Sequence, residues 1–288
     1  MVAFSWAGPL VRLTDAPALA VAAWRLLFSV AFIALVLAVR CFARTGRAGS
    51  EAPPGGGRLT RAEWLLACVA GCLLAAHFWV WIASLRFTTV SSSVILVSTQ
   101  PLFVGILSLV FLGERPAPRE WLGIGIAVVG AGVIGWGDVR LGGTALLGDG
   151  MALAAAVLAA GYFVVGRSLR EKLDLWSYVA VVYGVAALVL SAGVVITPGV
   201  PMVAYDLPDW LVFVALAAGP MMIGHTGINY ALRYLRAYLA NLAVLGEPVG
   251  AILIAWLLPA IAEPPSWQVL AGGLLILTGV GTALSRRG

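Results

Sequence analysis

Residues 77–103 read HFWVWIASLRFTTVSSSVILVSTQPLF, and residues 224–251 read GHTGINYALRYLRAYLANLAVLGEPVGA. Superposing Pro101 on Pro248 aligns the two stretches without a gap. The alignment then pairs Leu85 with Leu232, Arg86 with Arg233, Phe87 with Tyr234, Val97 with Val244 and Gln100 with Glu247. The same pattern occurs twice in one chain, and this predicts an internal duplication.

The segments that follow the two copies also match. When Glu114 is set on Glu263, three glycines of one copy meet three of the other, although the distance from proline to glutamate differs by two residues. The pairs are Gly123 with Gly272, Gly130 with Gly279, and Gly132 with Gly281. We expect these glycines to allow close helix packing. The repeat boundary falls near residue 143, which predicts two halves, residues 1–143 and residues 144–288.

The composition places both halves in a membrane. Of the 288 residues 61% are hydrophobic and 11% are charged, with a mean hydropathy of +1.00. A soluble domain carries about 25% charged residues, so this chain lacks the charge that a water-exposed surface requires. Disordered proteins, secreted disulfide scaffolds and soluble nucleic-acid binders are excluded, despite the net charge of +5.

Ten apolar segments are long enough, or nearly so, to cross the membrane as helices. They cover residues 1–13, 17–39, 63–84, 88–112, 119–137, 145–166, 176–197, 209–231, 236–259 and 267–285. Five spans per half is an odd number, so the second half enters from the opposite side. The predicted fold is an all-α integral membrane protein of ten transmembrane helices, arranged as two inverted-topology five-helix repeats. Such repeats permit alternating access to a site near the bilayer midplane.

Two features complete the topology. With the N-terminus in the cytoplasm, the basic residues between spans fall mostly on the cytoplasmic side and only Arg12, Arg86 and Arg140 fall outside, which predicts that both termini are cytoplasmic. Residues 40–62 form the one long loop, rich in Gly and Pro, and are expected to be a flexible tether. The first span is short, and we expect that the first helix is truncated at Met1.

The ten-span layout resembles the EamA-type permeases of the drug/metabolite transporter superfamily. The residues that carry the resemblance are Trp24-Arg25, TQPLFVGILSLVFLGERPAPREWLG from residue 99, and the second copy from Gly224 onward. The resemblance implies a small-metabolite permease, expected to be an exporter, in a bacterial inner membrane, with a central cavity between its halves. It implies no cofactor or metal, and its partners are the lipid bilayer, a small-molecule substrate, protons as a candidate co-substrate and a homodimer as a further candidate.

Ionisable residues inside spans are costly and are therefore candidates for the site. Arg25 and Glu247 both fall near the midplane, either as a structural ion pair or as groups that bind substrate or protons. Pro101 and Pro248 each remove a helical hydrogen bond at that depth, either as packing kinks or as structural kinks that expose carbonyl groups.

The two histidines bracket the midplane. His77 is predicted to line the cavity together with Trp81 and Ser84 on one helix face, and His225 together with Asn229 on another. Structural roles in helix packing are the alternative. Gln100 and Tyr162 complete the predicted substrate-binding set.

The leading hypothesis is a secondary active or facilitative transporter of a small metabolite such as an amino acid or related organic compound. A non-transporting sensor or scaffold on the same fold is one alternative. An intramembrane enzyme is the other, but the sequence contains no HExxH or GxSxG motif, and Gly148-Asp149 lacks the preceding glycine of a GxGD aspartyl site. The sequence also contains no nucleotide-binding GxxxxGK[ST] motif, so ATP-driven transport would need another protein.

Overall fold

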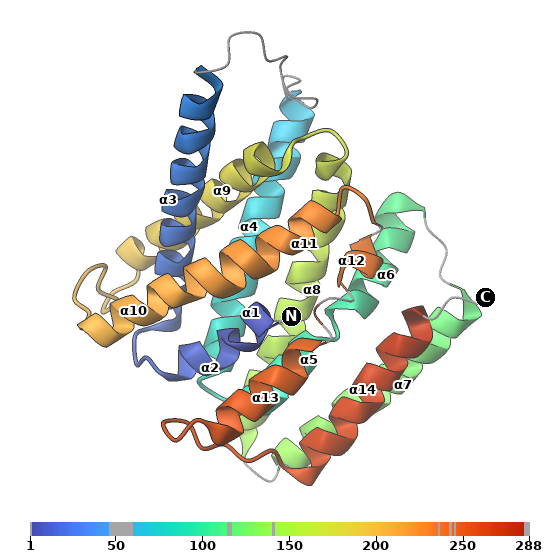
Figure 1. Ribbon diagram of the computed structural model, residues 1–288. Coiled ribbons are helices and arrows are strands. Elements are labelled where there is room, and N and C mark those ends of the chain that lie inside the picture. Colours follow the sequence, from blue (N-terminus) through green and yellow to red (C-terminus); the bar gives the residue numbers. More distant parts are fainter. Residues whose placement is uncertain are drawn as a thin grey trace.

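The computed structural model describes residues 2–45, 60–113, 117–139, 142–235, 237–241, 244 and 246–284. Within these ranges every regular element is a helix (Figure 1). The first half holds α1 (Val2–Ser5), α2 (Ala7–Arg12), α3 (Ala18–Thr45), α4 (Arg61–Ser84), α5 (Val90–Val97), α6 (Gln100–Leu112) and α7 (Pro118–Val139). The second half holds α8 (Gly143–Arg170), α9 (Leu175–Ile196), α10 (Leu207–Leu216), the π-helix η1 (Ala217–His225), α11 (Thr226–Ala231), α12 (Ala237–Asn241), α13 (Glu247–Leu257) and α14 (Trp267–Leu284).

Seven helical segments of the described chain are long and apolar enough to cross a membrane, and two shorter apolar helices accompany them. The seven are Ala18–Ala43, Arg61–Ser84, Val90–Phe111, Trp121–Val139, Gly143–Arg170, Leu175–Ile196 and Leu207–Ala231, and the shorter helices are Glu247–Leu257 and Trp267–Ala283. The chain is therefore built as a multi-pass membrane protein. Helices also occupy the other predicted spans, but the inverted arrangement of two five-span halves stays a prediction.

The boundaries differ from the predicted ones mainly at the charged ends of helices. Helix α3 continues to Thr45 and α8 continues to Arg170, so both run past the predicted ends of their spans. At the end of α8, Arg170 is buried and donates to the carbonyl groups of Asn229 and Leu173, and these contacts hold the extended helix end within the protein. The predicted tether therefore begins later than residue 40, and its residues 46–59 lie outside the described residues.

Within the described residues, four of the predicted spans are interrupted helices, namely the first, the fourth, the eighth and the ninth. The first is divided at Trp6 into α1 and α2, and the fourth is divided after Val97 into α5 and α6. Pro101 lies in the first turn of α6, and Pro248 lies in the first turn of α13. Proline is tolerated there because the first turn of a helix has free N–H groups anyway. The two predicted kinks are thus helix starts, led by Gln100 and Glu247.

The eighth span contains a nine-residue π-helix, η1, between α10 and α11. Pro220 lies inside it and has no N–H to donate, and in an α-helix its ring would clash with the preceding turn. The wider π turn avoids that clash. Such segments often occur at functional sites, and η1 ends at His225.

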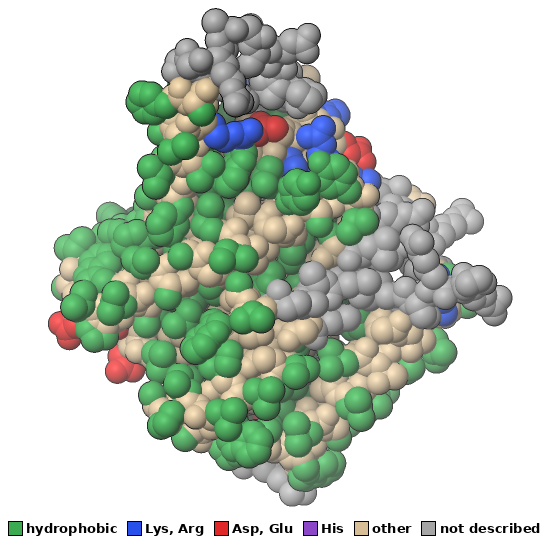
Figure 2. All heavy atoms as spheres, viewed as in Figure 1, with side chains coloured by type: hydrophobic (Ala, Val, Ile, Leu, Met, Phe, Trp, Pro, Cys, Tyr) green, Lys and Arg blue, Asp and Glu red, His purple; other side chains and the backbone are tan. Residues whose placement is uncertain are grey.

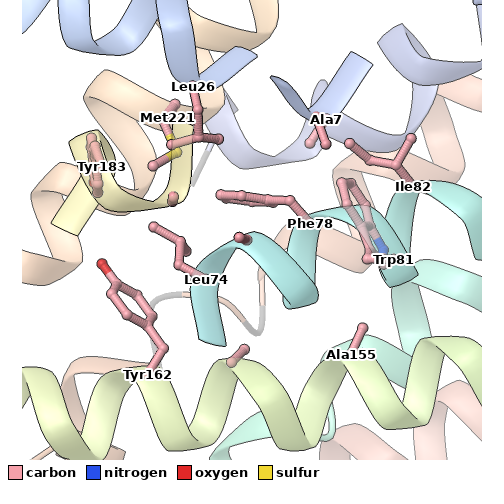
Figure 3. Close-up of a cluster of buried hydrophobic side chains, with 14 of the residues drawn as sticks. Ala7, Leu26, Leu74, Phe78, Trp81, Ile82, Ala155, Tyr162, Tyr183 and Met221 are labelled. Carbon is pink, nitrogen blue, oxygen red and sulfur yellow. The ribbon is translucent and has the colours of Figure 1, made fainter. Parts of the chain in front are cut away.

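The core lies where the two halves interleave. Helix α4 of the first half packs against α8 and α9 of the second half, and α3 packs against α9. Figure 3 shows Phe78 and Trp81 projecting from α4 into this core, with Tyr162 rising from α8. All three side chains are almost fully buried. The first half therefore contributes the central helix of a core that the second half largely surrounds.

Glycines allow α7 and α14 to lie in close contact along their length (Figure 1). A Cβ atom added to Gly130 would lie 2.6 Å from the carbonyl oxygen of Gly272, and one added to Gly272 would lie 2.6 Å from that of Gly130. Gly132 and Gly281, in contrast, have nothing within 4 Å of an added Cβ. The expected close packing thus rests on part of the matched glycine set.

The surface is apolar over most of its described area. Figure 2 shows one face on which green side chains dominate and the charged side chains gather towards the ends. Trp136 is 71% exposed and Ile196 is 78% exposed. Large exposed apolar areas of this kind are unfavourable in water, and they match a protein whose flanks face lipid.

The contact between α7 and α14 generates a prediction. We expect Gly130→Ala to lower the free energy of unfolding by about 1–3 kcal/mol, because the added methyl group overpacks the contact with the backbone of α14. Gly132→Ala is the matched control, and it should be neutral or stabilising by up to about 1 kcal/mol because alanine favours the helix. Thermal unfolding of the purified full chain in nanodiscs measures both. Equal effects of the two variants would contradict the packing account.

Candidate functional site

One cavity of the described chain is lined by buried polar side chains from both halves. Its volume, which includes the part open to solvent, is about 410 Å³. The lining comes from both halves: Phe4, Ala7, Arg25, His77, Phe78, Trp81, Val97 and Gln100 from the first, and Phe163, His225, Ile228, Val244 and Glu247 from the second. Six of the predicted substrate-binding residues are in this set, namely Arg25, His77, Trp81, Gln100, His225 and Glu247.

Arg25 is the buried cation of the cavity. Its side chain is 1% exposed, and its guanidinium carbon lies 4.0 Å from the centroid of the Phe78 ring. The Nε and Nη1 atoms have no hydrogen-bond partner among the described residues. Glu247 lines the same cavity, but the two groups do not form an ion pair within 4.0 Å. Arg25 and Glu247 therefore share the cavity without a direct ion pair.

The two histidines belong to different halves of the chain but lie close together in space. Their ring centroids are 6.2 Å apart. His77 Nδ1 lies 2.8 Å from the carbonyl oxygen of Ala155, so Nδ1 carries the proton and Nε2 is left as an acceptor. His225 Nδ1 has no hydrogen-bond partner among the described residues. The histidine of the second half is thus the less constrained of the two.

Aromatic rings form the apolar wall around His225. The Phe4 ring is tilted against it at 5.1 Å, the Phe78 ring meets it edge-on at 5.0 Å, and the Phe163 ring lies parallel to it at 6.2 Å. Trp81 stacks in parallel with His77 at 6.5 Å, and its indole Nε1 has no partner. The wall therefore offers flat faces with a few polar atoms between them.

Two helices begin at the cavity, and they differ in their first residue. Glu247 is the first residue of α13, where a carboxylate complements the positive end of the helix dipole. Gln100 is the first residue of α6, and its amide donates a hydrogen bond to the side chain of Asn241. Asn241 in turn donates to the carbonyl of Ala237 at 2.9 Å. The α6 terminus therefore lacks a carboxylate of its own.

Three of the predicted site residues lie outside the cavity lining. Ser84 donates to the carbonyl of Trp81 at 2.6 Å, one helical turn back, and contacts Ser93 at 2.8 Å. Its hydroxyl is thereby used within the helix packing. The expected His77–Trp81–Ser84 face is thus interrupted at Ser84, because a serine hydroxyl in a helix readily bonds a preceding carbonyl.

Asn229 and Tyr162 are the other two, and they bond to each other. The Tyr162 hydroxyl donates to Asn229 Oδ1 at 2.8 Å, and Asn229 Nδ2 donates to the Tyr183 hydroxyl at 3.1 Å. Tyr183 then lies 3.1 Å from the hydroxyl of Thr226. This buried network joins α8, α9 and α11 beside the cavity. Asn229 is therefore placed to hold helices together, and its polar atoms are engaged within the protein.

Sequence reasoning missed the apolar part of the lining. Phe163 follows directly after the candidate Tyr162, so a rotation by one residue decides which of the two side chains faces the cavity. His77 and its neighbour Phe78, in contrast, both line it. Phe4 and Ala7 lie in the short first span, where none of the predicted site residues falls.

An ion pair and several hydrogen bonds join the two halves at the end of the molecule near α2. Arg12 pairs with Glu263 at 3.0 Å and donates to the carbonyl of Thr88 at 2.8 Å, while the Val90 amide donates to Glu263 at 2.9 Å. Thr14 donates to Asp209 at 2.5 Å. These contacts lie beside the short helices that carry Phe4 and Ala7. They connect a first-half helix to two second-half segments.

Basic residues gather at the other end. Lys172 donates to Glu63 at 2.6 Å, and this hydrogen bond raises the pKa of Lys172. Arg40 lies 3.9 Å from Asp174, and Arg167 donates to the carbonyl of Leu232 at 2.8 Å.

Among the described residues, no cluster of three His, Cys, Asp or Glu side chains is suited to hold a metal ion.

Comparison with protein families gives a match over almost the whole chain. The EamA-like transporter family matches residues 1–136 and again residues 146–285. The two matched ranges fall on either side of the predicted repeat boundary.

Individual relatives are named as transporters. An uncharacterized transporter, YdfC, of Bacillus subtilis is 30% identical over 199 residues, which are 67% of this chain and 62% of the relative. An uncharacterized transporter of Archaeoglobus fulgidus is 27% identical over 67% of each chain. A riboflavin transporter of Rhizobium johnstonii is 28% identical over 47% of this chain and 45% of its own. The matched region thus spans less than two thirds of the Bacillus relative.

A solved crystal structure shares the fold. Its TM-score to this chain is 0.68, over 98% of this chain and 93% of the other, at 20% sequence identity. Similarity at this level of identity concerns the fold alone.

The network around Asn229 generates a prediction. We expect Asn229→Ala to lower the free energy of unfolding by about 1–3 kcal/mol, because it leaves the Tyr162 and Tyr183 hydroxyls buried without this partner. Tyr162→Phe should cost less, about 0.5–1.5 kcal/mol, because Asn229 keeps its bond to Tyr183. Unfolding in detergent micelles measures both. If Asn229→Ala is as stable as the wild type, the network does not hold these helices.

Proposed function

Because this chain belongs to the EamA-like transporter family, as its resemblance predicted, we propose that it is an alternating-access permease that moves a small metabolite through a central cavity. The family and its named relatives indicate a membrane transporter rather than an enzyme. The proposed substrate is an amino acid or related organic compound, and the proposed direction is export. The mode of transport is secondary active or facilitative.

The observation that carries the proposal is a buried polar cavity lined by both halves. Arg25 and His77 enter it from the first half, and His225 and Glu247 enter it from the second. A site at the interface of two repeats changes its access when the halves rearrange against each other, while its lining stays in place. The sequence duplication, with five predicted spans per half, supports the inverted relationship that this movement requires.

The cavity chemistry supports an amphipathic substrate. Aromatic rings supply a flat apolar surface, and Arg25, the histidines and Glu247 supply polar contacts. The relative named as a riboflavin transporter indicates that a flat aromatic molecule is handled within this range of sequences. We propose that the substrate-binding set consists of the six predicted residues in the lining, with Ser84, Tyr162 and Asn229 supporting it from outside.

The charge distribution supports a bacterial inner-membrane orientation with both termini in the cytoplasm. The end that carries Arg40, Arg167 and Lys172 is the basic one. The opposite end carries Arg12 and Arg86, and at both ends acidic neighbours lie within 4.0 Å of basic side chains, so the orientation rests on the larger number of Arg and Lys residues at the first end. A topology with the basic end inside satisfies the usual distribution of Lys and Arg.

A non-transporting sensor or scaffold is the second candidate function. Ligand recognition in the same cavity would serve it equally well, because a fold alone does not establish transport. Vesicles discriminate between the two. A transporter exchanges a labelled metabolite across the membrane, whereas a sensor binds it without exchange. The metabolite to label is the one that accumulates in the medium of overexpressing cells relative to cells that lack the protein.

Proton coupling through Glu247 is testable in such vesicles. An imposed pH gradient should stimulate uptake by the wild type. Glu247→Gln should lose this stimulation and keep the exchange of labelled for unlabelled substrate, because glutamine cannot release or take up a proton. Glu171→Gln, at a side chain 58% exposed outside the cavity, is the control and should behave as the wild type. Wild-type uptake that ignores the gradient would rule out Glu247 as a proton carrier.

The orientation generates a separate prediction. In a variant whose cysteines Cys41, Cys68 and Cys72 are replaced by serine, a charged maleimide added to intact cells should label Val203→Cys and not Glu171→Cys. The reagent cannot cross the hydrocarbon layer, and these exposed positions lie at opposite ends of the spans. Inverted vesicles should reverse the result. Labelling of Glu171→Cys in intact cells would overturn the proposed topology.

A further inference from the structure

The polar atoms left without partners in the cavity are mainly hydrogen-bond donors. Arg25 Nε, Arg25 Nη1 and the indole Nε1 of Trp81 are buried and unpartnered among the described residues, and none of them can accept a hydrogen bond. His225 Nδ1 is also unpartnered and serves as a donor in one of its two tautomers. Buried polar atoms are normally bonded, so this set calls for a ligand that brings acceptors.

The positive charge of Arg25 indicates that the ligand is an anion. The guanidinium is stacked on Phe78 and has no carboxylate within 4.0 Å. Glu247 is the one carboxyl group of the lining, and it lies at the N-terminus of its own helix, α13. The helix dipole there favours its negative charge. The cation of the cavity is therefore left for a ligand.

The start of α6 brings no second carboxyl group to the cavity. Its first turn faces the cavity at Gln100 and has no acidic residue. Ser98 and Thr99 join α5 to α6 with helical backbone, so the C-terminal end of α5 offsets the positive end of α6. Arg25 is therefore the cation that faces the ligand. Glu247 already supplies one carboxyl group, so a ligand with a single negative charge fits better than a dianion.

The shape of the wall indicates the other part of the ligand. The Phe4, Phe78 and Phe163 rings surround His225 at centroid distances of 5.0–6.2 Å. Flat aromatic groups pack favourably in offset or edge-on contact with such rings. A planar carboxylate matches the planar guanidinium beside them, with which it can form two parallel hydrogen bonds.

On these grounds, and resting on the proposed function, we propose that the cavity recognises an aromatic monocarboxylate. The carboxylate binds Arg25, and the ring packs against the aromatic wall that Phe4, Phe78 and Phe163 form together with His225. Arg25 is then the residue that selects acids over amides and amines of the same shape. Trp81 Nε1 and His225 Nδ1 are further donors for the carboxylate or for a polar group on the ring.

The test is equilibrium binding of three size-matched probes to the full chain in nanodiscs, measured by calorimetry. The probes are 3-phenylpropionate, 3-phenylpropionamide and 3-phenylpropylamine. We expect the acid to bind about tenfold or more tightly than the amide, because a hydrogen bond to a charged group contributes at least that factor. The comparison within the wild type needs no variant, so it does not depend on whether a variant folds.

Substitutions then assign the preference to Arg25. Arg25→Gln should weaken the acid about tenfold or more and leave the amide nearly unchanged, so that the two probes bind alike. Arg25→Lys should retain part of the preference, because it keeps the charge and loses the planar fork. Arg40→Gln removes an equal charge from a half-exposed position and is the control. It should leave binding of all three probes unchanged.

Several results would overturn the inference. They are equal binding of acid and amide to the wild type, tightest binding of the amine, an acid preference that persists in Arg25→Gln, and no binding of any probe at millimolar concentration. Exchange assays in vesicles separate this inference from the proposed function. Acid-selective binding with no exchange of any metabolite would leave the recognition intact and refute transport, whereas exchange without acid selectivity would do the reverse.

Discussion

One buried cation, Arg25, organises the centre of this protein. A charge in an apolar interior is costly unless other groups compensate it, and the usual compensation is a carboxylate in direct contact. Here the guanidinium lies instead on the face of Phe78, and Glu247 shares its cavity without pairing with it. Four further buried polar side chains, His77, Gln100, His225 and Glu247, come from different helices and line the same cavity.

Both continuous and interrupted helices line this cavity. The continuous helices α3, α4 and α8 contribute lining residues that include Arg25, His77 and Phe163. In contrast, α6 begins at Gln100, α13 begins at Glu247, and a π-helix ends at His225. Within a bilayer, interrupted backbone is tolerated only where protein or a polar cavity receives the freed groups. Helices α7 and α14 have no lining residue and are regular, with glycines that let their backbones approach.

The candidate site was only partly predictable from the sequence. Arg25, His77, His225 and Glu247 stood out because ionisable residues are rare in spans, and the structure places all four on one cavity. Ser84 and Asn229 were expected on the same faces, but hydroxyl and amide groups find partners locally, Ser84 one turn back and Asn229 on two tyrosines. Phe78 and Phe163 were not singled out, because an aromatic residue in a span is usually packing. Helix phase, which shifts by about 100° per residue, placed Phe163 rather than its neighbour Tyr162 at the cavity, whereas His77 and Phe78 both line it.

The sequence by itself determined the membrane environment, the spans, the duplication and the short set of buried charges. Each of these follows from composition, segment length or internal similarity, which are properties that a linear chain contains. Only the tertiary structure decided which polar atoms are left unpartnered. That outcome depends on distances between residues far apart in the chain, such as Tyr162 and Asn229, which satisfy each other, and Arg25 and Glu247, which do not. Hydrogen bonds act over about 3 Å, and no pattern in the sequence resolves positions so finely.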